Sequence, residues 1–145
     1  METRGIRNCN PGNIRRGSKW VGLRPEQTDK AFDQFIDMKW GVRAIIIVLR
    51  SYVTIHHCQN VKDIIRRWAP PSDGNDTEDY IKRVQTMLND EGFTISETLG
   101  GTFFQANSNE EFFYIFVLIK AICFIESGYR LPFKVYLEAY YLTLK

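Results

Sequence analysis

The sequence has few cysteines and histidines, and this scarcity excludes several kinds of protein. Cys9, Cys58 and Cys123 are far apart, odd in number and form no C-x-x-C pair. A disulfide framework or a structural zinc site is therefore not expected. The two histidines, His56 and His57, are adjacent, and adjacent side chains seldom turn toward one metal ion. We predict no metal and no cofactor.

Several motifs and segments are also missing. The chain contains no G-x-S-x-G, no P-loop and no G-x-G-x-x-G, which argues against serine-hydrolase and nucleotide chemistry. The most apolar run, residues 112–127, is interrupted by Lys120 and is shorter than the ~20 residues that a membrane span needs. The polar, arginine-rich start does not look like a signal peptide. We expect a protein without a membrane span that is made in the cytoplasm and exported by another route.

The composition indicates one globular domain over residues 1–145, because 44% of the residues are hydrophobic and 14% are aromatic. Turn residues and apolar alternation predict short strands at 14–15, 20–21 and 31–36. These strands would form a small β-lobe over residues 4–36.

Helices are predicted for the lobe at 37–145, where apolar residues recur with a helical period between capping residues. The predicted helices cover 37–55, Asn60 to Pro70, Asp76 or Thr77 to Gly92, about 109–126, and 132 to about 144. The expected fold class is α+β, mainly helical, with a cleft between the two lobes.

The opening stretch RGIRNCNPGNIRRG, residues 4–17, contains four arginines and three asparagines but no acid. Such a cationic loop suits either a polyanion or a solvated surface. Because the net charge of the chain is only +2, nucleic acid is not the expected partner. Steep salt dependence of binding would be the mark of a nucleic-acid partner.

One glutamate is placed where acid catalysis is plausible. Glu126 ends the most apolar predicted helix, and Gly128 follows it. A carboxyl group among apolar neighbours holds its proton more readily, which suits a general acid. The alternative is a solvated glutamate at a helix end. Asp33, on the predicted strand 31–36, is the candidate for a second carboxylate.

Four blocks of sequence carry a resemblance to a known family. They are RGIRNCNPGNIRRGSKWVGL, FDQFIDMKWGVRAIIIVLRSY, IIRRWAPPSDGNDTEDYIKRV and AICFIESGYRLPF. The chain resembles the virion-associated lytic family of phages and prophages, whose members are often labelled only as structural proteins. This resemblance implies a lysozyme-like, lytic-transglycosylase-type fold and cleavage of peptidoglycan. It also implies peptidoglycan and virion proteins as partners, and action at the cell wall or in the virion.

The resemblance also implies substrate-binding residues in the opening loop. Asn8, Asn10 and Asn13 would bond sugar hydroxyl and N-acetyl groups, because an amide both donates and accepts. Arg7 and Arg15 would meet carboxylates of the wall. The alternative is that the asparagines brace the loop through bonds to its backbone.

A weaker similarity to the glucosaminidase and transglycosylase branch of lysozyme-like enzymes implies that Tyr80 lines the cleft. Trp68 would be a helix anchor or a sugar platform. In that branch the catalytic glutamate precedes the small lobe, where this chain has only residues 1–3. Because IESGY resembles the Glu-Ser motif of lytic transglycosylases, we expect a circular permutation. Glu126 would then be the acid, with Tyr129 beside the substrate.

The chain departs from the family pattern at two positions. Cys9 stands where an asparagine is usual, and Ile125 stands where a histidine is common. Two hypotheses therefore stay open. The first is a transglycosylase assisted by the substrate's own N-acetyl group, or a muramidase that uses Asp33 as well. The second is a non-catalytic virion or cell-wall-binding protein on the same fold.

Overall fold

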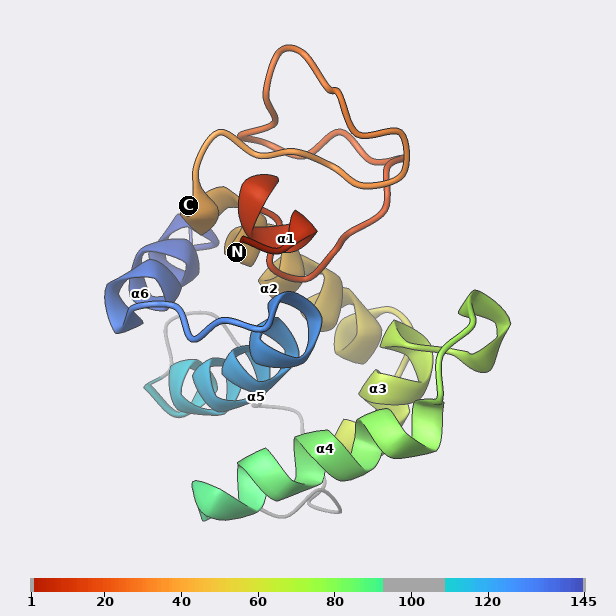
Figure 1. The fold of residues 1–145 in the computed structure, drawn as a ribbon. Helices are drawn as coiled ribbons and strands as arrows, with labels where there is room; N and C mark the ends of the chain where they lie inside the picture. The colour runs from red at the N-terminus through yellow and green to blue at the C-terminus, as the bar shows by residue number, and fades with distance from the viewer. Residues whose placement is uncertain (1, 93–108, 145) are drawn as a thin grey trace. The chain divides into compact units, whose positions relative to one another are not determined.

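The computed structural model of the chain describes residues 2–92 and 109–144, with side chains from residue 112 onward in the second range. Its regular elements are helices (Figure 1). They are α1 (Arg4–Arg7), α2 (Met38–Thr54), α3 (Val61–Trp68), the 3-10 helix η1 (Pro71–Asp73), α4 (Thr77–Asp90), α5 (Asn109–Ser127) and α6 (Phe133–Leu142). The irregular stretch that the sequence predicts after Gly92 lies outside the described residues.

The five helices predicted from apolar periodicity and capping are confirmed as α2 to α6. The side chain of Asn60 caps α3 by accepting a hydrogen bond from the backbone N–H of Asp63. Asp76 caps α4 in the same way. After α5, Gly128 has a φ of +78°, a left-handed conformation that ends helices and favours glycine. Local sequence signals therefore place these helices well, although α1 and η1 were not predicted.

The predicted β-lobe is wrong. Residues 2–37 form α1 and otherwise irregular backbone, and the described part of the chain contains no strand. In place of the expected strand pairing, the described residues form two isolated antiparallel bridges, one between Arg15 and Phe32 and one between Leu23 and Phe35. The fold is mainly helical rather than α+β. The circular permutation, which would have placed a helix beside that lobe, loses its basis.

Side chains take several of the backbone hydrogen bonds that a β-ladder would have used. Oδ1 of Asp29 accepts from the N–H groups of Ala31 and Phe32 at 2.9 and 3.0 Å. Gln27 pairs with the backbone of Gln34 in both directions, each bond being 2.8 Å long. Such side chains offer the backbone an alternative to ladder bonds. Alternation of apolar and polar residues at 31–36 therefore did not produce a strand.

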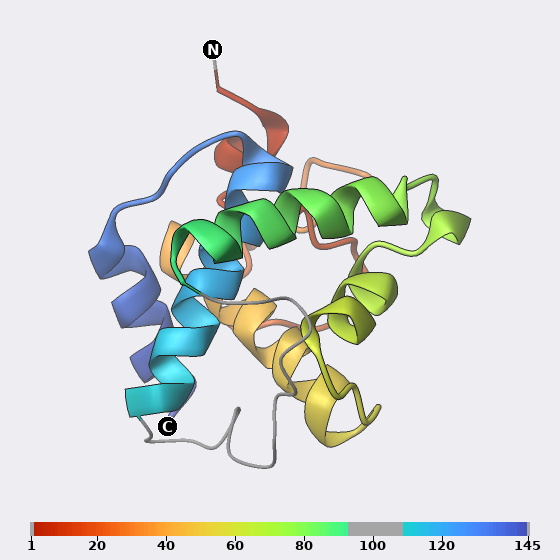
Figure 2. The ribbon, with the colours of Figure 1, turned by 90° about the horizontal axis from the view of Figure 1, so that it is seen from below.

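Contacts divide the chain into two compact units, Met1–Ile47 with Ile122–Lys145, and Val48–Ala121. The first unit has a core that includes Phe35, Val42, Ile45, Ile122 and Tyr136. In the second unit α3 and α4 pack side by side (Figure 1, Figure 2). Its buried side chains include Ile64, Ile65, Val84, Leu88 and Leu118.

The first unit contains a close approach between α2 and the opening loop. A Cβ atom on Gly41 would lie 2.1 Å from the carbonyl oxygen of Cys9 and 3.0 Å from Cδ of Pro11. Cys9 and Asn13 both have a φ of 50°, in the left-handed region that residues other than glycine seldom occupy. The loop is thus a tightly folded structure that needs a glycine on the facing helix.

Gly41→Ala should destabilise the protein, although alanine is the better helix former by about 1 kcal/mol. The methyl group would meet backbone, which cannot move aside as a flexible side chain can. We expect a loss of about 1–3 kcal/mol in the free energy of unfolding, measured by urea denaturation. Lys134→Ala, at an exposed position of α6, is the control and should change little. A more stable Gly41→Ala protein would contradict the close approach.

Candidate functional site

Glu126 lies in the last turn of α5, half-buried, and Asn13 holds its side chain. Nδ2 of Asn13 donates to the carboxylate Oε1 of Glu126 at 3.3 Å and to its backbone carbonyl oxygen at 3.2 Å. The two residues are 113 positions apart in the sequence. The opening loop and the end of α5 therefore meet at the glutamate that the sequence singled out.

The N-terminus is fastened to the same helix end. The hydroxyl of Thr3 donates to the carbonyl oxygen of Ser127 at 2.7 Å. Ser127 is buried, and its own hydroxyl donates to the carbonyl oxygen of Cys123 at 2.6 Å. A Cβ atom on Gly5 would lie 3.1 Å from Oδ1 of Asn13 and 3.6 Å from Cβ of Ser127. Helix α1 thus packs closely where Asn13 and α5 meet.

The amide of Asn13 has a defined orientation toward Glu126. Its nitrogen faces the glutamate, whereas its Oδ1 is buried and has no hydrogen-bond partner among the described residues. An amide in this orientation can donate to a carboxylate but not accept from it. Asn13 is therefore a positioning group for Glu126.

Asn10 braces the loop, which is the alternative that the sequence left open. It is fully buried, and its Nδ2 donates to the carbonyl oxygens of Ile14 and Asp33, both at 2.9 Å. Its Oδ1 accepts from the backbone N–H of Ile14 at 2.9 Å. These bonds use the whole amide inside the loop, so little of it can face a ligand.

Asn8 is also buried and also bonds within the loop. Its Nδ2 donates to Oδ2 of Asp29 at 2.9 Å, and its Oδ1 accepts from the side chain of Gln34 at 3.0 Å. Of the three asparagines expected to contact sugar, the structure therefore turns two inward and brings Asn13 to Glu126.

Asp29, which the sequence reasoning missed, is the centre of this loop. Arg4 donates two hydrogen bonds to its carboxylate, from Nε and Nη2, both 2.6 Å long. With the bond from Asn8 and those from the backbone N–H groups of Ala31 and Phe32, the Arg4 pair holds the pKa of Asp29 far below its usual range. The excess of arginine in residues 4–24 could have predicted it, because several positive charges in one segment favour an acidic partner nearby.

Asp29→Asn should lower the melting temperature at pH 7, because the carboxylate is stabilised in the folded state only. A carboxyl group whose pKa is lower in the folded than in the unfolded protein stabilises the fold at pH values above the unfolded pKa, ~3.9. This stabilisation is lost as the pH falls below that pKa. The difference in melting temperature from the wild type should therefore shrink from pH 7 to pH 3. The exposed Asp90→Asn is the control. A constant difference across this range would contradict the pairing.

Asp33, the predicted second carboxylate, differs from Asp29 in that its pKa is raised and not lowered. Its side chain is only 2% exposed, and its Oδ2 has no hydrogen-bond partner in the described part of the chain. Burial raises its pKa, with the charge of Arg16 opposing the shift. Its backbone bonds are to Asn10 and Ile14 of the loop. The carboxyl group is therefore enclosed by the loop.

Asp33→Asn should leave the protein at least as stable as the wild type at pH 7. A carboxyl group whose pKa is higher in the folded than in the unfolded protein stabilises the fold at pH values below the unfolded pKa, ~3.9. This stabilisation is lost as the pH rises through the pKa of the folded protein. The melting temperature of the variant should therefore gain on that of the wild type between pH 4 and pH 7. A variant that loses stability over this interval would show that the Asp33 carboxylate has a partner.

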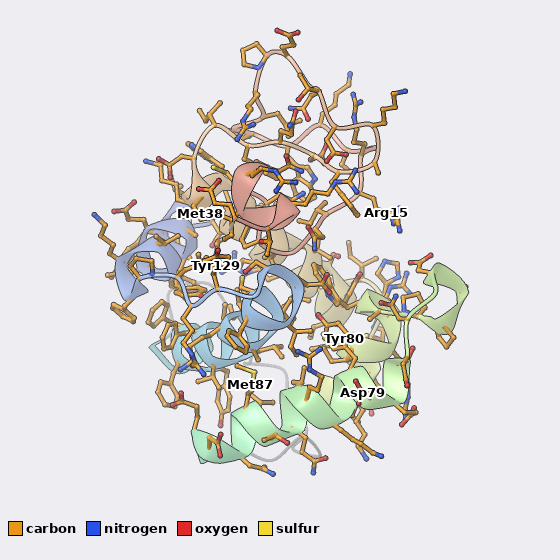
Figure 3. All side chains as sticks on the ribbon, viewed as in Figure 1. Arg15, Met38, Asp79, Tyr80, Met87 and Tyr129 are labelled. Atoms are coloured by element: carbon orange, nitrogen blue, oxygen red, sulfur yellow. The ribbon has the colours of Figure 1, made fainter. Side chains whose placement is uncertain are left out.

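Three predicted substrate-binding residues of this unit are exposed. Arg7 bonds the carbonyl oxygen of Glu2 at 2.8 Å. The guanidinium of Arg15 lies 5.3 Å from the centre of the Phe32 ring, to which Arg4 is also close, at 4.6 Å. Tyr129 follows α5 and is 37% exposed. Figure 3 shows Arg15 on the N-terminal loop and Tyr129 beyond the end of α5.

Trp68 and Tyr80 belong to the second unit. Nε1 of Trp68 donates to the hydroxyl oxygen of Tyr80 at 3.1 Å, which ties α3 to α4. Tyr80 is 7% exposed, and Figure 3 shows it on α4. Trp68 thus has the contacts of a helix anchor, one of the two roles named for it. Its use as a sugar platform and that of Tyr80 as a cleft residue stay predictions.

Among the described residues, no three His, Cys, Asp or Glu side chains lie together so that they could hold a metal ion. No helix in residues 2–92 or 109–144 has the length and apolar character to cross a membrane.

A phage protein is a homologue of this chain. Over 85 residues, the chain is 40% identical to "Protein P5" of Pseudoalteromonas phage PM2. The matched region covers 56% of this chain and 52% of the relative. The chain thus matches about half the length of that curated relative. No protein-family model matches the chain. The phage-related part of the resemblance is confirmed, and its lytic part stays a prediction.

Proposed function

We propose that this phage-related chain cleaves the glycan strand of peptidoglycan, with Glu126 as the general acid. The pair of Glu126 and Asn13 is the observation that supports the proposal. A half-buried carboxyl group at a helix end is held by one amide while α1 fixes the loop against the helix. Positioned carboxyl groups of this kind protonate leaving groups in glycoside cleavage.

Glu126 would donate its proton to the glycosidic oxygen as the bond to the anomeric carbon breaks. Asp33 is enclosed by the loop, so the predicted second carboxylate is not available as the nucleophile. The carbonyl oxygen of the substrate's N-acetyl group would take that role, which is an accepted variant of the two-carboxylate mechanism. Glu126, now a carboxylate, would then accept a proton from the sugar's own C6 hydroxyl, giving an anhydro-sugar, or from water.

Substrate contacts in this proposal come from the exposed residues of the first unit. Arg7 and Arg15 offer guanidinium groups that match the carboxylates of lactyl and peptide groups. Tyr129 offers a partly exposed ring beside the end of α5. Asn8 and Asn10 hold the loop in shape. The site of action would be the cell wall or the virion, with peptidoglycan and virion proteins as partners.

A non-catalytic virion or cell-wall-binding protein is the second candidate. One observation favours it. The buried amides of Asn8 and Asn10 and the enclosed carboxyl group of Asp33 show that three of the predicted site residues stabilise the loop rather than face a ligand. Such a protein would keep the loop and its arginines for binding and would not turn over substrate.

Digestion of purified peptidoglycan by the wild type and by Glu126→Gln tests both candidates, with the products identified by mass spectrometry. We expect the variant to lose activity by about 10²–10⁴-fold, the usual contribution of general acid catalysis. Glu138→Gln, at an exposed position of α6, is the matched control and should keep full activity.

The products decide between the mechanisms. Anhydro-sugars would establish a transglycosylase, whereas reducing ends would establish hydrolysis. Equal activity of the wild type and Glu126→Gln would remove Glu126 from the mechanism. If neither protein cleaves but both sediment with peptidoglycan, the non-catalytic candidate is favoured.

A further inference from the structure

The second unit contains a pocket that the proposed cleavage does not use. It is a depression open to solvent with a volume of about 630 Å³. It is lined by Tyr52, Cys58, Asp63, Arg66, Arg67 and Pro70. These residues come from the end of α2, from α3, and from the loops on either side of α3. All of them lie in one compact unit.

Arg67 is one of the two arginines that line the pocket. Its guanidinium lies 5.4 Å from the centre of the Tyr52 ring, a cation–π contact that orients the group. No Asp or Glu of the described residues lies within ion-pair distance of it. Arg67 therefore presents several N–H donors that are not used in an ion pair among the described residues.

Tyr52 and Cys58 form an uncharged wall. Burial raises the pKa of the Tyr52 hydroxyl and that of the Cys58 thiol, so both stay protonated at neutral pH. The backbone N–H of Cys58 donates to the carbonyl oxygen of Tyr52 at 2.9 Å, and His57 between them has a φ of 60°. A defined turn thus holds this wall. It offers an O–H donor rather than a nucleophile.

Asp63 adds a charge of the opposite sign. Its Oδ2 accepts from the backbone N–H of Gln59 at 3.0 Å, and its own N–H donates to the side chain of Asn60 at 2.9 Å. These bonds fix Asp63 in the first turn of α3. Arg66 is 3.9 Å from Glu78, but both side chains are more than half exposed, so this pair neutralises Arg66 only weakly.

We infer that this pocket binds an amino acid or a short peptide by its free carboxyl terminus. A carboxylate matches the planar donors of Arg67, and the Tyr52 hydroxyl can donate to it as well. Asp63 would repel a doubly charged phosphate, but it can accept from the ammonium or amide N–H of an amino acid. The inference stands whether or not Glu126 cleaves glycan, because it rests on different residues in the other unit.

Titration of the ¹⁵N-labelled full chain with L-alanyl-L-alanine, followed by NMR, tests the inference. We expect saturable binding and shifts in the amide signals of the lining residues other than Pro70, which has no N–H. L-alanyl-L-alaninamide lacks the carboxylate and should bind at least tenfold more weakly. Arg67→Gln should weaken dipeptide binding by a similar factor, because it removes the charged donor. Arg83→Gln, at an exposed position of α4 in the same unit, should not.

Asp63→Asn supplies a second, independent variant. It should weaken binding of the dipeptide, which has an ammonium group, more than binding of N-acetyl-L-alanine, which has none. Well-dispersed spectra of each variant establish that it is folded. Equal affinity for the dipeptide and its amide, unchanged binding by Arg67→Gln, or no shifts at pocket residues would each overturn the inference. Tighter binding of inorganic phosphate than of the dipeptide would overturn the assignment of a carboxylate ligand.

Discussion

The structure of the opening segment depends on one carboxylate. Asp29 accepts two bonds from Arg4, one from Asn8 and two from the backbone of the loop. Because the described chain has no β-ladder there, these bonds act together with isolated backbone bonds, such as those from Asp33 to Ile14 and from Ile36 to Gly22, to hold the segment in place. Arg4 belongs to α1, so the same carboxylate also fastens the first helix of the chain to the loop.

The candidate site follows from that fastening. Helix α1 packs against the end of α5 through Thr3 and Gly5, and the loop that follows α1 brings Asn13 to Glu126. Asparagine serves two purposes in this loop, since Asn8 and Asn10 stabilise its shape whereas Asn13 holds the glutamate. A stretch whose composition resembles a sugar-binding surface is therefore partly a structural element.

Asp29 and Asp33 show how the environment separates two residues of the same type, four positions apart. Asp29 accepts from the guanidinium of Arg4 and from three other N–H groups, one of Asn8 and two of the backbone, so its ionised form is favoured in the folded state. Asp33 has a buried oxygen without a partner, so its neutral form is favoured. A buried carboxyl group that lacks a partner costs stability at neutral pH.

The sequence by itself determined α2 to α6, because helical period and capping are local and act within a few residues. It also singled out Glu126, from its place after an apolar helix. Only the tertiary structure decided the rest. The strands predicted at 14–15 and 20–21 did not form, and the one at 31–36 failed because Asp29 and Gln27 take backbone bonds of Ala31, Phe32 and Gln34, a competition that alternation of residues does not reveal. The partner of Glu126 is 113 positions away, and the contact of Tyr52 with Arg67 joins two helices. Contacts of this kind depend on how the chain folds back on itself, which no short stretch of sequence encodes.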